Sequence, residues 1–356
     1  MIDIKFEALS RIGLTPFIAG QVTAMQDASE ISGRAMRIVE TQRDAFTLHD
    51  GNTEHGARVM PHTLRVLQAQ GDALTIGDWV LVNADTHNDL WITHRLPPVT
   101  QIARRANDGR RQPLASNVDT ALLVMGLDAD FNVRRAERYI ALVHASGVEA
   151  VVVLTKADAV RDWHQRMAVL RDRLPPTVPV LAMNGMSTDA RLALAPWLGA
   201  GQTLVTLGSS GAGKSTLTNT LTTVSAQDTG GVRHGDGRGR HTTTARSLHR
   251  CPEGACIIDT PGLRTWRPDA DAQALAATFE DVQRLSPACR FRDCRHQGEP
   301  GCAVEEHVAG DRLVNYRKLL RDAQRSEQTP LERIAQRRKW KKLGKAGNER
   351  AKEKRP

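Results

Sequence analysis

Residues 204–221 read LVTLGSSGAGKSTLTNTL, an apolar run followed by a glycine-rich turn and a helix-forming stretch. The turn from Gly208 to Ser215 matches G-x-x-x-x-G-K-[ST], and its position between a strand and a helix is the context in which this motif binds nucleotide phosphates. Glycine permits positive φ, which brings backbone N–H groups against the β-phosphate, and the helix N-terminus adds partial positive charge. The stretch therefore predicts a P-loop nucleotide-binding domain, although it does not distinguish ATP from GTP.

The loop and the start of the helix supply the predicted phosphate and Mg²⁺ contacts. Lys214 is expected to bridge the β- and γ-phosphates, and Ser215 is expected to ligate Mg²⁺ through its hydroxyl. The alternative is a Gly/Ser-rich turn that matches by chance, and the strand–turn–helix context argues against it. The predicted nucleotide contacts in this segment are Gly208, Ser209, Ser210, Gly211, Ala212, Gly213, Lys214, Ser215 and Thr216.

A second phosphate-site motif ends the next apolar strand, where residues 256–262 read CIIDTPG. The last four residues match D-x-x-G, with Asp259 expected to hold Mg²⁺ through water and the Gly262 N–H expected to contact the γ-phosphate. Such tetrads are common, but a match at the end of a buried strand, downstream of a phosphate loop, is more specific. It predicts the γ-phosphate sensor of the site.

Between the two motifs lies a glycine-rich segment, residues 230–248, which reads GGVRHGDGRGRHTTTARSL. Ordering glycine costs much conformational entropy, so no regular element is expected there. The segment is either a surface loop or a switch loop that the γ-phosphate and Mg²⁺ order and that hydrolysis releases. One of Thr242, Thr243 and Thr244 is expected to reach the metal, and Thr243 is the favoured ligand.

The base-reading motif precedes the phosphate loop. Residues 151–158 read VVVLTKAD, and Thr155–Asp158 matches [NT]-K-x-D at the end of an apolar strand. The Asp158 carboxylate could accept hydrogen bonds from guanine N1–H and N2–H₂, a donor pair that adenine lacks, and the Lys156 stem could pack on the base. Considered alone, an ordinary strand-end turn with a helix-capping aspartate is the better explanation.

The order of the motifs changes that assessment. In the usual GTPase order this motif follows D-x-x-G, yet nothing after Gly262 supplies it at a strand end. Thr155–Asp158 is instead followed by another strand with a polar end, residues 180–184, and then by the phosphate loop. A circularly permuted GTPase domain explains both facts, and permutation is tolerable because the termini of compact domains often lie close together.

Three of the five cysteines and one histidine form a compact cluster near the C-terminus. Cys289-x₄-Cys294-x-His296-x₅-Cys302 is a Cys₃His set typical of a tetrahedral structural Zn²⁺. Three free buried thiols or an iron–sulfur site are the alternatives, but the intervening loop is too polar to fold without a metal. His307 is a possible competing ligand. Cys251 and Cys256 are interpreted as core thiols, since an odd cysteine count without an export signal argues against disulfides.

The remaining pattern predicts a multidomain chain. Short alternating segments within residues 35–96 indicate an OB-type or SH3-type barrel, used for RNA binding or as a scaffold. Residues 100–116 are polar and basic and are interpreted as a linker or exposed loop. From residue 118, aliphatic runs alternate with helical stretches, which predicts a mostly parallel sheet with helices on both faces. The predicted divisions are an N-terminal segment 1–34, an OB-type barrel 35–98, a permuted GTPase domain 99–278, a helical zinc domain 279–330 and a basic tail 331–356.

The charge of the chain indicates a polyanionic partner. Formal net charge is +9, from 49 Lys and Arg against 40 Asp and Glu, and the pI is about 9.7. Nucleic acid is the commonest polyanion, although a generally basic surface would give the same balance. No apolar run approaches the ~20 residues that span a bilayer, and no secretory signal is visible. We therefore expect a cytoplasmic protein without membrane contact.

Together these motifs resemble one family, the small ribosomal subunit biogenesis GTPases (RsgA, also called YjeQ or YloQ). The resemblance covers nearly the whole chain. It implies an N-terminal OB-fold, GTP hydrolysis stimulated by the small (30S) ribosomal subunit, and a role late in maturation of that subunit. We also expect contact with 16S rRNA and a monomeric protein. It rests on Asn117–Asp119, Thr155–Asp158, Gly208–Ser215, Gly239–Thr244, Asp259–Gly262 and the Cys₃His spacing.

Two departures are visible. Leu263 stands where Ras-like enzymes use Gln to orient water, so the resemblance makes His241 the hypothetical replacement. Asn184 and Gly185 stand where the family usually shows Ser-Ala, but a backbone N–H could still reach guanine O6. The alternatives are a permuted GTPase acting on the large subunit, a nucleotide-gated RNA-binding protein with negligible turnover, and an ATPase in which Thr155–Asp158 is a chance match.

Overall fold

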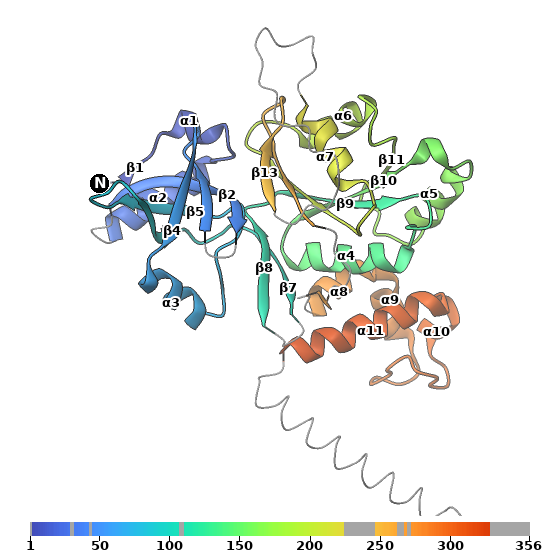
Figure 1. Cartoon of the computed structure of the whole chain (residues 1–356). Helices are drawn as coiled ribbons and strands as arrows, with labels where there is room; N and C mark the ends of the chain where they lie inside the picture. The colour runs from blue at the N-terminus through green and yellow to red at the C-terminus, as the bar shows by residue number, and fades with distance from the viewer. Residues whose placement is uncertain are drawn as a thin grey trace, which may run out of the picture.

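The computed structural model describes residues 2–28, 32–42, 45–106, 110–223, 246–261, 267–268 and 272–327. Figure 1 shows a β-barrel beside an α/β sheet domain, with a group of C-terminal helices packed under helix α4 of the sheet domain. The nucleotide motifs lie in the sheet domain and the Cys/His cluster lies in the C-terminal helices.

The barrel is of the predicted OB type. Its strands follow the order β2-β3-β4-β6-β5, and β5 pairs back with β2, which closes the barrel. The β4–β6 pair is parallel because α3 crosses between β4 and β5. Apolar side chains such as Met36, Ile38, Leu48 and Ile92 fill the interior. The elements are β2 (Gly33–Gln42), β3 (Ala45–His49), β4 (Glu54–Val59), α3 (Pro61–Ala69), β5 (Trp79–Ala84) and β6 (Leu90–Arg95).

The N-terminal segment packs on the barrel. Strand β1 (Ile2–Asp3) pairs in parallel with β2, and helices α1 (Phe6–Ser10) and α2 (Pro16–Ala28) follow it. Leu9 and Ile12 are buried in the same apolar cluster as residues of the sheet domain. The segment thus contributes to the core between barrel and sheet.

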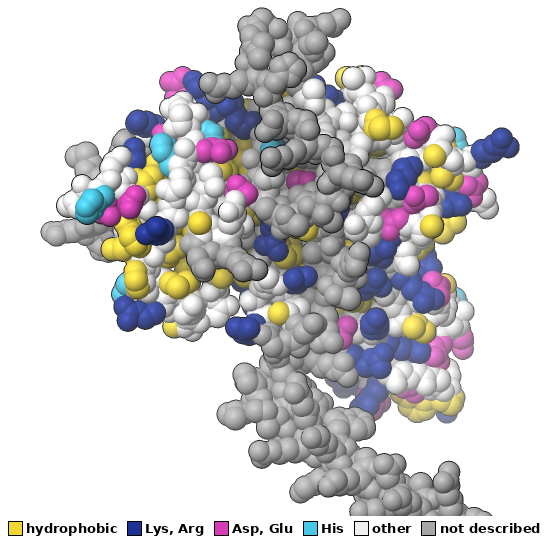
Figure 2. Space-filling view, viewed as in Figure 1, with side chains coloured by type: hydrophobic (Ala, Val, Ile, Leu, Met, Phe, Trp, Pro, Cys, Tyr) yellow, Lys and Arg dark blue, Asp and Glu magenta, His cyan; other side chains and the backbone are white. Residues whose placement is uncertain are grey.

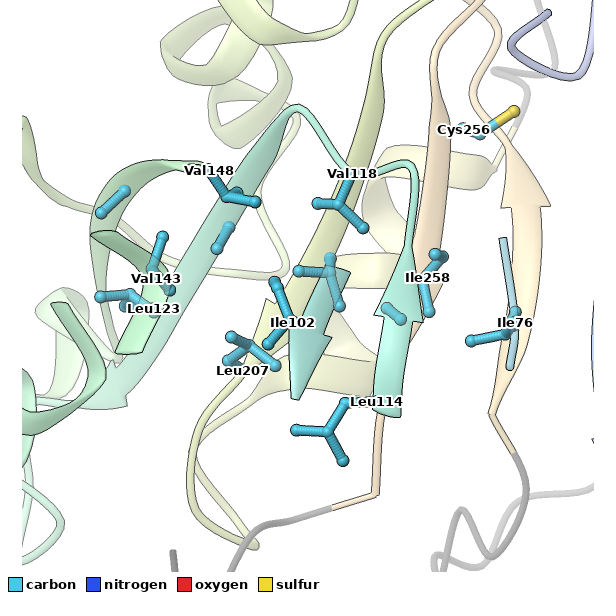
Figure 3. Close-up of a cluster of buried hydrophobic side chains, with 14 of the residues drawn as sticks. Ile76, Ile102, Leu114, Val118, Leu123, Val143, Val148, Leu207, Cys256 and Ile258 are labelled. Carbon is cyan, nitrogen blue, oxygen red and sulfur yellow. The ribbon is translucent and has the colours of Figure 1, made fainter. Parts of the chain in front are cut away.

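The interpretation of residues 100–116 as a linker or exposed loop was wrong. They form an antiparallel hairpin of β7 (Gln101–Arg105) and β8 (Arg111–Ser116). Figure 3 shows Ile102 and Leu114 of this hairpin packed with Leu207 and Ile258 of the sheet domain. A β-bulge beside Ile102 interrupts the strict alternation of faces, and residues 113–116 are buried as one continuous run, so the hairpin is covered over most of β8.

The sheet domain confirms the predicted mostly parallel sheet. Strands β11, β10, β9, β12 and β14 are parallel in that order, and β13 adds an antiparallel strand. Along β9, Leu123 packs in one apolar cluster with α4 and α5, and Leu122 packs in another with α6 and α7. The elements are β9 (Thr120–Gly126), α4 (Val133–Ala145), β10 (Glu149–Thr155), α5 (Trp163–Arg171), β11 (Val180–Ala182), α6 (Asp189–Leu194), β12 (Thr203–Leu207), α7 (Lys214–Thr222), β13 (Ser247–Arg250) and β14 (Cys256–Asp259).

A buried arginine joins the barrel to the sheet domain. Arg37 of β2 is fully buried, and its guanidinium donates to the carbonyl of Ile12 at 2.5 Å, the carbonyl of Asn117 at 3.1 Å and the hydroxyl of Thr203 at 3.0 Å. It also lies 5.4 Å from the Trp79 ring centroid. Ile12 belongs to the N-terminal segment, Asn117 precedes β9, Thr203 lies in β12 and Trp79 lies in the barrel. One side chain therefore connects all four parts of the fold.

The C-terminal helices form an apolar core of their own. Phe279, Val282, Leu313 and Leu319 are buried together, and Ala141 of α4 joins them from the sheet domain. A two-residue strand, β15 (Arg267–Pro268), pairs with β7 and leads into this region. The helices are α8 (Ala272–Thr278), α9 (Glu280–Leu285), α10 (Ala303–His307) and α11 (Gly310–Glu327).

Candidate nucleotide and metal sites

The phosphate loop connects β12 to α7 and requires glycine at several positions. Gly211 and Gly213 have φ of +81° and +94°, a region that side-chain-bearing residues rarely adopt. A Cβ on Gly208 would lie 2.2 Å from the carbonyl oxygen of Val124, so only glycine fits against the neighbouring strand. The loop opens α7 in the predicted strand–loop–helix arrangement.

Lys214 lies folded over its own loop. Its ammonium donates to the carbonyls of Gly208 at 3.2 Å and Ser209 at 2.8 Å, and the residue is buried. Burial lowers the pKa of Lys214, and the charges of Asp259 and Asp130 oppose that effect. A buried ammonium whose described hydrogen bonds go to carbonyl oxygens is a favourable partner for a phosphate.

Two of the predicted Mg²⁺ residues, Ser215 and Asp259, lie in direct contact. The Ser215 hydroxyl donates to Asp259 Oδ2 at 2.9 Å, across 44 residues of sequence. Thr206 donates to the other oxygen, Oδ1, at 3.1 Å. Parallel pairing of β12 with β14, in which Val205 faces Ile258, brings the end of β14 beside the phosphate loop. A hydroxyl and a carboxylate are oxygen ligands of the kind that Mg²⁺ prefers.

The candidate guanine motif also touches the phosphate loop. Thr155 donates to the carbonyl of Ala212 at 2.6 Å, and the Lys156 ammonium donates to the carbonyl of Gly211 at 2.9 Å. Lys156 has φ of +63°, an unusual value for a residue with a side chain, and this turns the chain sharply at the strand end. Asp158 follows in a 3₁₀ turn and is exposed, so its carboxylate is accessible to a ligand.

The next strand end completes this edge. Thr220 of α7 donates to the carbonyl of Gly185 at 2.7 Å, and the Asn184 side chain accepts from the Met186 N–H at 2.9 Å. Asn184 and Gly185 therefore lie beside the helix that the phosphate loop opens. The ends of β10, β11, β12 and β14 meet at the carboxyl edge of the sheet, which is where open α/β sheets bind ligands.

Several predicted residues lie outside the part of the chain that the structure describes. They are His241, Thr243 and Gly262, together with Thr242, Thr244, Leu263 and the basic tail from residue 331.

Two acidic residues in the site were not anticipated from the sequence. Asp128 and Asp130 follow β9 directly, and they contact Lys156 and Ser209 respectively. The available signal was their position, since two acids at the end of a buried strand in a parallel sheet lie at the same edge as the other motifs.

The four predicted metal ligands are gathered into one cluster. Their ligand atoms all lie within 4.8 Å of one another. Cys289 Sγ lies 4.0 Å from Cys302 Sγ, and His296 Nδ1 lies 3.3 Å from Cys302 Sγ. Ligand atoms around a tetrahedral Zn²⁺ with Zn–S of about 2.3 Å are spaced at about 3.7 Å, so this set fits such an ion.

The surroundings of the cluster also suit a metal. His296 Nε2 lies 3.2 Å from the hydroxyl of Ser286, which leaves Nδ1 facing the thiols. A hydrogen bond to the ring nitrogen that faces away from the thiols holds the imidazole in this orientation. Burial raises the pKa of Cys289, but hydrogen bonds from the N–H groups of Val304 and Ala303 and with the thiols of Cys302 and Cys294 together lower it overall. His307 does not join the cluster and instead hydrogen-bonds the carbonyl of Ala303.

Comparison with known proteins agrees with this geometry. A family model described as RsgA GTPase matches residues 96–268. The chain is 41% identical over 317 residues to the small ribosomal subunit biogenesis GTPase RsgA of Xanthomonas oryzae pv. oryzae (strain PXO99A), with 87% of this chain and 86% of the relative covered. The chain belongs to the RsgA GTPase family. A second RsgA relative, from Xanthomonas axonopodis pv. citri (strain 306), is 42% identical with the same coverage.

Two solved structures share the fold of this RsgA chain. YjeQ from Thermotoga maritima is 20% identical with a TM-score of 0.55, over 81% of this chain and 98% of that one. YloQ, described as a circularly permuted GTPase, is 19% identical with a TM-score of 0.54, over 83% and 96%. As an RsgA GTPase the chain uses a guanine nucleotide, and GTPases generally require Mg²⁺. Across the described ranges, no helix is long and apolar enough to cross a membrane.

Proposed function

We propose that this chain is a GTP hydrolase that docks on the small ribosomal subunit during its late maturation and is stimulated by it. The observation that carries the proposal is the contact of Thr155 and Lys156 with the phosphate loop. A motif that precedes the loop in sequence lies beside it in space, which is the arrangement a permuted guanine site needs. The relatives are named small ribosomal subunit biogenesis GTPases, which supports the choice of partner.

The residues receive the following roles. Lys214 neutralises the β- and γ-phosphates, while Ser215 and Asp259 hold Mg²⁺ directly and through water. Asp158 accepts two hydrogen bonds from guanine, and the Gly185 N–H donates to guanine O6. Lys214 and Ser215 already lie at the opening of the helix, where the macrodipole favours phosphate.

The Cys₃His cluster holds one structural Zn²⁺ in this proposal. Four protein ligands leave no open coordination position, so the ion has no part in hydrolysis. Its role is to fold the polar loop between Cys294 and Cys302 against α10 and α11, because that loop contributes few apolar contacts of its own.

Docking on rRNA relies on positive charge in this proposal. Lys and Arg side chains gather over the C-terminal helices in Figure 2, and the chain carries a net charge of +9. An OB-type barrel is a common RNA-binding module. Affinity for the subunit should then fall with salt by a log–log slope of about −0.7 to −0.9 for each phosphate neutralised. A truncation that removes residues 331–356 should flatten this slope and leave GTP affinity unchanged.

The test is a GTPase assay with purified protein alone, with 30S subunits and with 50S subunits. We expect a slow basal rate, strong stimulation by 30S subunits only, and loss of both rates in Lys214→Ala. Stimulation by 50S subunits alone would indicate that the protein acts on the large subunit instead. Nucleotide-dependent 30S binding without turnover would favour a gated RNA-binding protein, an alternative that Leu263 keeps open because leucine cannot hydrogen-bond the attacking water.

A further inference from the structure

The loop between β9 and α4 places two carboxylates against the nucleotide site. Asp128 and Asp130 stand two residues apart at the carboxyl end of β9, so they reach the same edge of the sheet as the phosphate loop. Neither belongs to a recognised nucleotide motif. Each contacts a different part of the candidate site.

Asp130 holds the start of the phosphate loop. Its Oδ1 accepts from the Ser209 hydroxyl at 2.5 Å, and its Oδ2 accepts from the Gly126 N–H at 3.1 Å. The Arg135 guanidinium lies 2.5 Å from Oδ1 and also donates to the Asp130 carbonyl. The carboxylate is therefore fixed from the strand end and from the first turn of α4, and it presents one oxygen to the loop.

Asp128 acts on the base side of the same site. Its Oδ2 lies 2.7 Å from the Lys156 ammonium, which also donates to the Gly211 carbonyl at 2.9 Å. Lys156 is thus held at its tip between a carboxylate and the phosphate loop. Contacts at the tip restrict the side chain of Lys156, whose aliphatic stem is the part that the guanine motif would pack on the base.

We propose that Asp130 and Asp128 are positioning residues that set the two halves of the nucleotide site before GTP arrives. The proposal rests on the nucleotide site described under the proposed function. Asp130 acts through Ser209 on the phosphate loop, and Asp128 acts through Lys156 on the base side. Neither residue touches the nucleotide itself in this proposal.

The physical reason is preorganisation. A loop with glycines at 208, 211 and 213 has many conformations available, and binding must select one of them. A contact that already holds the loop in the free protein removes part of that entropic cost and so strengthens binding. Such a contact supports ground state and transition state equally, and its loss should raise KM with little change in kcat.

The test is a double-mutant cycle on the Kd for a fluorescent GDP analogue, using Asp130→Ala, Ser209→Ala and the double variant. A hydrogen bond to a charged group corresponds to roughly a tenfold change in Kd. We expect each single variant to raise Kd about tenfold and the double variant to raise it no further. Asp130→Asn should recover part of the affinity, because its amide oxygen can still accept from Ser209.

The matched control is Asp72→Ala in the barrel. The Asp72 side chain is 16% exposed and lies 2.6 Å from Arg95, while Asp130 is 15% exposed and lies 2.5 Å from Arg135. Losing either carboxylate should lower thermal stability similarly, whereas only Asp130→Ala should change nucleotide affinity. Steady-state GTP hydrolysis by Asp130→Ala should show a raised KM and a kcat within twofold of wild type.

Asp128 gives an independent readout. Asp128→Ala should raise the Kd for GDP and the Kd for inosine diphosphate by the same factor. The reason is that Asp128 acts through Lys156 and not through the hydrogen bonds of Asp158 to the base. If Asp130→Ala and Ser209→Ala bound GDP with the Kd of the wild type, or if their effects were strictly additive in the cycle, the positioning role would be overturned. The proposed nucleotide site would not be affected by either result. A wild-type protein without guanine selectivity would overturn the nucleotide site and the positioning role together.

Discussion

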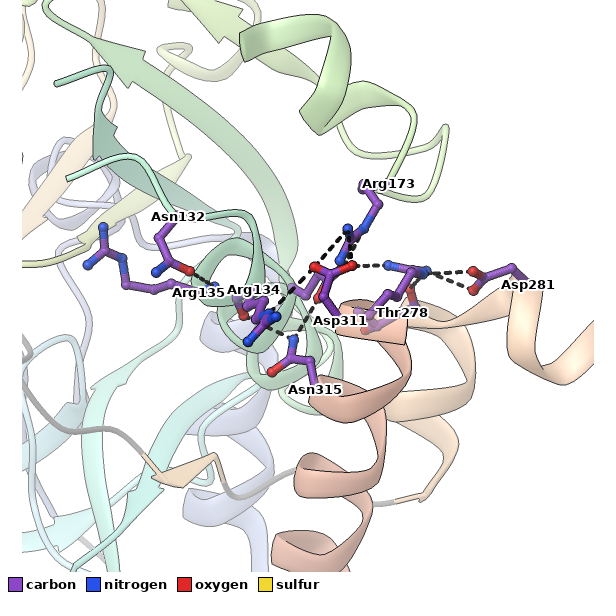
Figure 4. Close-up of polar contacts among 10 residues, drawn as sticks. Asn132, Arg134, Arg135, Arg173, Thr278, Asp281, Asp311 and Asn315 are labelled. Atoms are coloured by element: carbon purple, nitrogen blue, oxygen red, sulfur yellow. Dashed lines mark hydrogen bonds and ion pairs between the residues drawn. The ribbon is translucent and has the colours of Figure 1, made fainter. Parts of the chain in front are cut away.

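Glu137 of α4 is the centre of a buried polar network that should determine how firmly the C-terminal helices are attached. Its side chain is fully buried, and it accepts from Arg173 at 2.9 Å, Arg312 at 2.6 Å and Asn315 at 2.6 Å. Figure 4 shows the surrounding contacts, among them the pair of Arg173 with Asp311. Arg312 also donates to Asp281, at 2.7 Å. Because α11 carries Arg312 and Asn315, the network joins the sheet domain to the C-terminal helices.

Replacing Glu137 by alanine should destabilise this junction. Breaking a buried ion pair by removing one partner typically costs about 3–5 kcal/mol. Here both cations keep another carboxylate, since Arg312 retains two contacts with Asp281, at 2.7 and 2.8 Å, and Arg173 retains Asp311 at 3.1 Å. We therefore expect the lower end of that range, about 3 kcal/mol.

Thermal unfolding is the measurement. For units of 150–250 residues, 1 kcal/mol corresponds to about 2–4 °C, so the transition of Glu137→Ala should fall by about 6–12 °C. Amide exchange should accelerate in α8 and α11 more than in β9 and β10. The control is Asp162→Asn, which breaks an exposed pair with Arg166 at 3.1 Å and should cost under about 1 kcal/mol. A loss of stability in Glu137→Ala no greater than in the control would refute this reasoning.

Three further outcomes follow from the described geometry. Asp158→Asn should weaken GTP binding and reduce discrimination against other bases by about 1–3 kcal/mol. Competition with ATP and inosine triphosphate would measure this loss, and equal affinity of the wild type for ATP and GTP would contradict the prediction. Cys294→Ser should lower bound zinc below one per chain and destabilise the C-terminal helices without changing Mg·GTP affinity; metal analysis that finds iron and sulfide, or no zinc in the wild type, would count against it. Burial raises the pKa of Asp78 to about 6, so the folded state binds its proton more tightly than the unfolded state. That contribution to stability is lost as pH rises from about 4 to 6. The free energy of unfolding of Asp78→Asn should therefore rise by up to about 3 kcal/mol relative to wild type across that window. Denaturant titrations that give the same difference between the two proteins at every pH would refute the assignment.

Much of the architecture was readable from local sequence. The parallel sheet and the barrel strands were predicted correctly, because each strand is a short apolar or alternating run bounded by turn residues. The clustering of the four candidate metal ligands could be predicted from spacing alone, since residues 289–302 are close in sequence and a tetrahedral set needs only a short loop. The phosphate loop could be found for the same reason, since its chemistry is contained in eight consecutive positions.

The features that the sequence did not reveal depend on contacts between distant segments. Strands β7 and β8 are buried against the sheet domain, where Ile102 and Leu114 pack in one cluster with Leu207 and Ile258, and no local pattern encodes that packing. Arg37 looks like an ordinary polar residue in a strand, yet its partners are Ile12, Asn117 and Thr203.

The same holds for the acidic residues of the site and the junction. Asp130 and Glu137 are two charges among many in the sequence, and their partners Ser209 and Arg312 lie 79 and 175 residues away. The sequence by itself determined which segments form strands, which eight residues form the candidate phosphate loop and which four residues form the Cys₃His cluster, because periodicity and short spacing are local properties. Tertiary structure alone decided which charges are buried and what they hold, because the free energy of a buried charge depends on partners that only the folded chain brings within reach.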